Sequence, residues 1–222
     1  MSSTTRLALL FFGASFLLAL GMSGADMGKV PWYVSRASGL VSYMLLSGSV
    51  VFGLLISTKA SDGILSRPLV FEIHQFTSVL TLSMLGLHAG SLLFDGFLSF
   101  TPGSILIPFE GPYRPFWVGL GIIATWSTAI VTGSFWARKQ LGQKNWRRLH
   151  YLSFLAWLLS LVHGFTAGTD SQLAPVFWMY VLSAAAVAGL LTYRIGGVIA
   201  PAPAPSRARP LPTTAEARQR AR

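Results

Sequence analysis

The chain contains four histidines, which occur as two pairs of nearly equal spacing. His74 and His88 are fourteen residues apart in one apolar segment, and His150 and His163 are thirteen residues apart in another. The imidazole of histidine is a common ligand of iron and other transition metals. Two such pairs, each spread along one membrane-spanning helix, would supply the axial ligands of two stacked haems.

The composition shows which elements must carry these side chains. Of 222 residues, 52% are hydrophobic and 11% are charged, whereas about 25% are charged in a typical soluble domain. Apolar runs of roughly twenty residues, the length that crosses a bilayer, recur along the chain. Such runs must be helical, because a strand open to lipid leaves backbone groups unpaired. We expect an all-α, six-helix transmembrane bundle with spans near residues 6–22, 34–57, 69–94, 116–136, 148–167 and 174–193.

Lysine and arginine are distributed unevenly over the loops between these spans. The loops after the second and fourth spans and the tail after the sixth span are rich in these residues, whereas the opposite loops carry most of the acidic residues. The positive-inside rule then places both termini in the cytoplasm of a multi-pass protein of the cell (inner) membrane. The same rule accounts for the net charge of +10, so we expect the bilayer, and no nucleic acid, as the partner of the basic residues.

Three regions are expected. Residues 1–30 hold the first span, with a cleaved signal peptide as the alternative, and an outer loop. Residues 31–195 form the histidine-bearing domain. Residues 196–222 are rich in Pro, Ala and Arg, a composition that predicts a disordered cytoplasmic tail.

The orientation pairs the histidines by depth. The third and fifth spans both enter from the cytoplasm and therefore run parallel, which pairs His74 with His150 at an inner haem iron and His88 with His163 at an outer one. Fourteen residues of helix rise about 21 Å and complete nearly four turns. Thirteen residues leave His163 about 140° out of phase with His150. Either the fifth helix tightens locally, or His163 reaches its haem from the side.

Other residues complete the expected cofactor sites. Haem propionates are anionic and favour arginine partners. We expect Arg36 and Arg114 to bind them at the outer interface, and Arg148, with Arg67 and Arg147 nearby, at the inner one. Trp157 is a candidate aromatic side chain between the two haems, with core packing as the competing interpretation.

The absence of cysteine restricts the redox chemistry. It excludes thiolate-bound iron–sulfur clusters, disulfides and covalently attached c-type haem. Any haem would therefore be bound without covalent attachment, as haem b is.

These residues resemble the ferric reductase-like transmembrane domain family. That family includes the membrane parts of NADPH oxidases and ferric reductases, and the haem-binding membrane subunit that serves bacterial periplasmic methionine sulfoxide reductase. The paired histidines carry the resemblance, and three local stretches add to it: WYVSRASGL at 32–40, PYRP at 112–115 and WRRLHY at 146–151. The resemblance implies a dihaem domain over residues 31–195 that binds two haem b.

The chain departs from the oxidases in lacking a flavin and nicotinamide motif. We therefore expect an oxidoreductase component that takes electrons from a cytosolic flavin reductase or from quinol. The outer acceptor would be ferric iron, oxygen or a periplasmic reductase. One alternative is a non-enzymatic haem-binding anchor for a partner reductase. Another is a histidine-lined metal or proton transporter without haem.

Overall fold

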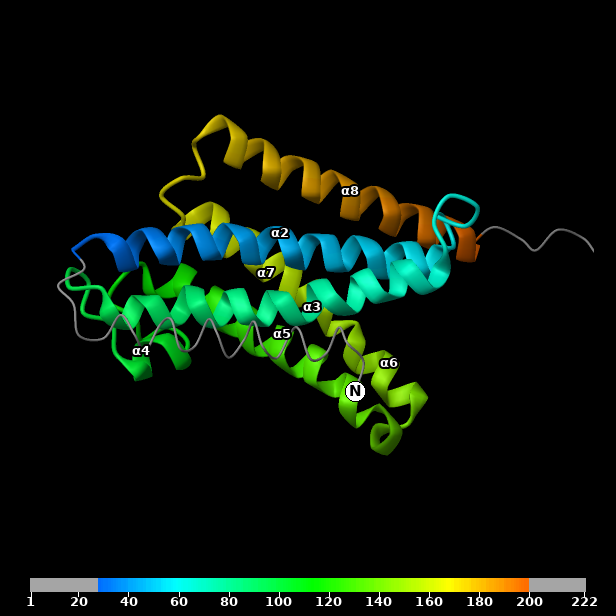
Figure 1. Cartoon of the computed structure of the whole chain (residues 1–222), viewed down its shortest axis with the longest axis horizontal. Coiled ribbons are helices and arrows are strands. Elements are labelled where there is room, and N and C mark those ends of the chain that lie inside the picture. Colours follow the sequence, from blue (N-terminus) through cyan, green and yellow to red (C-terminus); the bar gives the residue numbers. More distant parts are fainter. Residues whose placement is uncertain (1–27, 200–222) are drawn as a thin grey trace, which may run out of the picture.

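A computed structural model describes residues 28–199 of the chain (Figure 1). The predicted first span at 6–22 and most of the predicted tail lie outside these residues. Between residues 28 and 199 the regular structure is entirely helical, as expected for an all-α fold.

Five helical stretches are long and apolar enough to cross a membrane, as in a multi-pass membrane protein. They correspond to the second to sixth predicted spans. The long helices are α2 (Val30–Thr58), α3 (Arg67–Ser91), α5 (Pro115–Leu141), α7 (Leu152–Ala167) and α8 (Ala174–Ile199). The shorter helices are the 3-10 turn η2 (Leu92–Phe94), α4 (Pro102–Leu106) and α6 (Gln143–His150).

Proline marks where several of these helices begin. Pro31, Pro68, Pro102 and Pro115 each lie in the first turn of their helix. At that position the missing N–H would have had no partner in the helix, and the fixed φ already suits helical geometry. The sequence therefore sets these boundaries locally, before any packing between helices.

The helices associate as two antiparallel pairs and one outer helix (Figure 1). Helix α2 lies along α3, helix α5 lies against α7, and α8 packs on the side of α2. The two pairs meet mainly where α2 contacts α7, whereas α3 and α7 have few direct contacts. Space for side chains, and for a ligand, is therefore left between α3 and α7.

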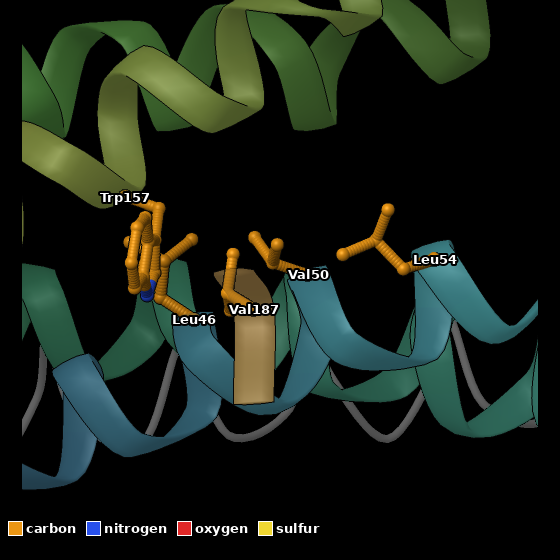
Figure 2. Close-up of a cluster of buried hydrophobic side chains, with 5 residues drawn as sticks. All are labelled: Leu46, Val50, Leu54, Trp157 and Val187. Atoms are coloured by element: carbon orange, nitrogen blue, oxygen red, sulfur yellow. The ribbon is translucent and has the colours of Figure 1, made fainter. Parts of the chain in front are cut away.

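A cluster of buried side chains from three helices holds the centre of the bundle together. Figure 2 shows this cluster, to which α2 contributes three residues, and α7 and α8 one each. Its members are Leu46, Val50, Leu54, Trp157 and Val187.

The predicted fifth span differs from a single helix. It begins earlier than expected, at Gln143, and is divided at Tyr151 into α6 and α7. Around the division, the Tyr151 N–H donates to the carbonyl of Arg148, and the Phe154 N–H donates to the carbonyl of Tyr151. Both bonds span three residues instead of four, which is the tighter 3-10 pattern. Local tightening was one of the two ways in which the thirteen-residue spacing was expected to be accommodated.

Candidate functional site

The structure brings the four histidines together as two facing pairs. The ring centres of His74 and His150 are 6.0 Å apart, and those of His88 and His163 are 6.2 Å apart. Helix α3 supplies one ring of each pair, and the α6–α7 segment supplies the other. The pairing predicted from the spacing is confirmed as geometry. We call His74 and His150 the inner pair, and His88 and His163 the outer pair, after the predicted orientation.

Both separations fit one metal ion held between two imidazoles. A metal–imidazole bond is about 2.0 Å long, and a ring centre lies about 1.1 Å behind its nitrogen. Two collinear bonds therefore put ring centres about 6 Å apart, which matches the observed 6.0 and 6.2 Å. Planes inclined by 67° and 71° exclude parallel stacking, whereas an edge-to-face contact of two rings has the same separation.

Three of the four rings are fixed in one tautomer by a backbone carbonyl on a neighbouring helix. Nδ1 of His74 lies 2.8 Å from the carbonyl oxygen of Ser49, Nδ1 of His88 lies 2.8 Å from that of Ser35, and Nδ1 of His163 lies 2.9 Å from that of Trp117. A carbonyl oxygen only accepts, so Nδ1 carries the hydrogen in each ring. Nε2 is then left with a free lone pair, as metal-binding histidines require.

A glycine lies four residues after each of these carbonyls and makes room for the ring. A Cβ atom at Gly39 would be 2.8 Å from Nδ1 of His88, and one at Gly121 would be 2.7 Å from Nδ1 of His163. A Cβ atom at Gly53 would be 3.3 Å from Cε1 of His74. Each ring therefore lies directly against the backbone of the helix that orients it.

This supporting layer was missed in the sequence, although a signal for it exists. Helix α2 carries serine and glycine four residues apart twice, at 35 and 39 and again at 49 and 53. The two copies are fourteen residues apart, the same interval that separates the histidines of α3. Because α2 and α3 are antiparallel neighbours, equal intervals place each copy opposite one histidine.

His150 lacks such support. Its Nδ1 is buried and has no hydrogen-bond partner within residues 28–199. Its nearest aromatic neighbour among those residues is Trp146, whose ring centre is 5.2 Å away. The inner pair therefore consists of one firmly oriented ring and one ring without a fixed tautomer.

Each histidine pair lines its own cavity. The inner cavity has a volume of about 360 Å³ and the outer cavity about 180 Å³. The inner volume lies within the ~300–1,000 Å³ that is usual for cofactor sites; the outer cavity is narrower. Leu46 of α2 belongs to both walls, so the two spaces approach each other at this side chain. Small and apolar side chains dominate both walls, as a flat hydrophobic macrocycle requires.

The outer cavity contains one of its two expected arginines. Arg36 lines it and donates from Nε to Asp170 at 2.7 Å, in an ion pair that joins α2 to the loop after α7. Arg114 does not line this cavity: its guanidinium donates to the carbonyl of Thr166. The neighbouring Tyr113 is in the wall instead. In the structure Arg114 therefore joins the start of α5 to α7, and its role toward a propionate stays a prediction.

Of the three cations expected at the inner cavity, Arg147 lines it and the other two do not. Arg148 is exposed and lies outside the wall, and Arg67 is engaged with Asp62 at 2.5 Å. The prediction for Arg148 is thus not supported by its position. Three arginines line the cavity: Arg138, Arg147 and Arg194. The first and last come from the ends of α5 and α8, which the sequence alone could not place beside His150.

Trp157 lines neither cavity. It is 9% exposed, belongs to the central cluster, and donates its indole N–H to the hydroxyl of Ser47 at 3.0 Å. These contacts are those of a core side chain, which was the competing interpretation, and its place relative to any haem stays a prediction.

Comparisons of the chain with protein-family models, with curated proteins and with solved structures find no match. The resemblance to the ferric reductase-like family rests on the residues quoted above. Among residues 28–199, no three histidine, cysteine or acidic side chains form a metal-binding group. Haem iron needs only two protein ligands, because the porphyrin supplies the other four.

Proposed function

We propose that the chain is a b-type dihaem cytochrome that conducts electrons across the membrane. The observation that carries the proposal is the spacing of the two histidine pairs, whose ring centres are 6.0 and 6.2 Å apart. Each pair lies in its own cavity, and three of the four rings present an unprotonated Nε2. Bound haem would supply a one-electron carrier at each level.

The chain's own residues would bind and orient these carriers. The pairs are fourteen residues apart on α3, or about 21 Å along the membrane normal by helical rise. The two imidazoles of each pair would hold one haem, which would supply one-electron transfer there. The buried Leu46 and its neighbours in the central cluster exclude water between the two levels.

The direction of transfer follows from the predicted orientation. Arg138, Arg147 and Arg194 gather at the inner cavity, the end that the positive-inside rule places in the cytoplasm. Electrons would enter there from a flavin reductase or from quinol. They would leave beside the outer pair, to ferric iron, oxygen or a periplasmic reductase. In this proposal the chain is a ferric reductase-like component whose turnover depends on a separate donor.

The test is electron transfer across a sealed membrane. The full chain would be purified with its haem and reconstituted into liposomes that enclose a ferric chelate, with a flavin reductase and NADPH added outside. We expect reduction of the enclosed chelate by the wild-type protein. His88→Ala and His74→Ala should abolish it, because each variant interrupts the path at one level.

Neighbouring residues provide matched controls. Leu87→Ala and Ile73→Ala remove an apolar side chain beside each histidine without touching the cavity walls, and they should retain transfer. Equal loss in a histidine variant and its neighbour would trace the effect to folding. Transfer that survives both histidine variants would refute the proposed path.

A further inference from the structure

His150 differs from the other three histidines in how it is held. Each of the other rings contacts a neighbouring helix through a carbonyl acceptor and a glycine four residues later. On α5 the corresponding glycine for His150 would lie thirteen or fourteen residues after Gly121. Those positions are Ser134 and Phe135. Helix α5 therefore supports one histidine of the α6–α7 segment but not the other.

The backbone hydrogen bonds also change beside His150. His150 is the last residue of α6, and a single residue with helical dihedral angles, Tyr151, joins α6 to α7. His150 and His163 therefore lie on either side of a locally tightened turn. No residue of α6 is buried as a whole, although ring nitrogens of Trp146 and His150 are, so α6 packs less completely than the long helices.

Two buried donors at this place have no acceptor. Nδ1 of His150 and Nε1 of Trp146 are both buried and both lack a hydrogen-bond partner in the part of the chain that the structure describes. Without an acceptor at Nδ1, the imidazole hydrogen can reside on either nitrogen. The ring is then not committed to presenting a free Nε2. Loss of such a partner typically weakens metal binding by roughly 10–100-fold.

We propose that His150 is an exchangeable ligand, so that the inner iron binds a small neutral diatomic molecule while the outer iron stays closed. This inference rests on the proposed haem function. The exchange breaks the bond between the metal and His150 Nε2 and forms one to the incoming molecule, with no change in oxidation state. The inner cavity is also the larger one, with about 360 Å³ against about 180 Å³ for the outer cavity. His88 and His163 resist exchange because a carbonyl and a glycine hold each ring in place.

Carbon monoxide is the probe. The purified, haem-loaded full chain would be reduced with dithionite and titrated with carbon monoxide, and the spectral change would be compared with the haem content. We expect about one carbon monoxide per chain, or half of the haem. The His150→Ala variant should also bind one carbon monoxide per chain, at the inner iron. Association should be faster, because no imidazole has to leave first. His163→Ala should bind two, because it opens the second iron.

The outcomes separate the two proposals. Wild-type protein that contains two haems but binds no carbon monoxide, or two per chain, would overturn the inference. So would the reverse pattern, with two bound in His150→Ala and one in His163→Ala. Wild-type protein without haem would instead overturn the proposed function. The number of carbon monoxide molecules bound per wild-type chain tests the inference even if a variant fails to fold.

Discussion

The glycine at position 121 permits a quantitative test of the outer site. A Cβ at Gly121 would lie 2.7 Å from Cγ and Nδ1 of His163, whereas ordinary contact begins near 3.4 Å. Gly121→Ala therefore displaces the ring by about 0.7 Å, the difference between these two distances. The displacement lengthens the 2.9 Å bond from His163 Nδ1 to the carbonyl of Trp117.

The energetic terms partly offset one another. Overpacking costs about 1–3 kcal/mol, and the lost hydrogen bond costs about 0.5–1.5 kcal/mol. The greater helix propensity of alanine than glycine stabilises the folded state by about 1 kcal/mol. We expect Gly121→Ala to lower the free energy of unfolding by about 0.5–3.5 kcal/mol, and to weaken haem binding at the outer pair by about 10–100-fold.

A graded series of glycines supplies the controls. Gly39→Ala should behave like Gly121→Ala, because its Cβ would lie 2.8 Å from the His88 ring, whereas Gly53→Ala should be milder, at 3.3 Å. A Cβ added at Gly48 or Gly133 would have no atom of another described residue within 4 Å, so alanine there should be neutral or stabilising. Thermal unfolding in detergent and haem content per chain measure both effects. If Gly121→Ala and Gly133→Ala gave the same haem content, a close fit of the outer ring would be refuted.

Three further outcomes are expected. Trp157→Phe should cost about 1 kcal/mol of stability through its lost hydrogen bond but leave the haem spectrum unchanged; an altered spectrum would place Trp157 beside a haem. A double-mutant cycle of Arg36→Ala and Asp170→Ala, read by thermal unfolding, should give a coupling of about 1–2 kcal/mol for this partly buried pair, and zero coupling would contradict the ion pair. The hydrogen bond from Arg67 lowers the pKa of the Asp62 carboxyl below its usual 3.8, so its small contribution to stability is present above that value and is lost as the pH falls through the lowered pKa. Asp62→Asn should remove this acid-dependent change, and an unaltered acid transition would show that the pair contributes nothing.

Much of this arrangement could be predicted because it depends on local patterns. Apolar run length predicted the five candidate spans that the structure describes. His74 and His88 lie fourteen residues apart, which sets their face and relative depth, and the distribution of lysine and arginine made the two spans parallel and so paired the histidines.

The parts that could not be predicted depend on contacts between helices. Arg148 and Arg147 are adjacent in the chain, but only Arg147 lines the inner cavity, because neighbouring positions on a helix face about 100° apart. Arg194 reaches the same cavity from α8, more than forty residues further along the chain. The division of the fifth span at Tyr151 was visible only as an awkward thirteen-residue spacing. The two backbone hydrogen bonds that mark it, each spanning three residues, are seen only in the structure.

The haem content of the purified chain tests the central claim most directly. Protein from haem-replete cells, assayed by its reduced-minus-oxidised spectrum and by haem per chain, should contain two haem b. His88→Ala should lose the outer haem, whereas Val162→Ala, next to His163 and outside both cavity walls, should keep both. A folded, colourless wild-type protein would contradict the account.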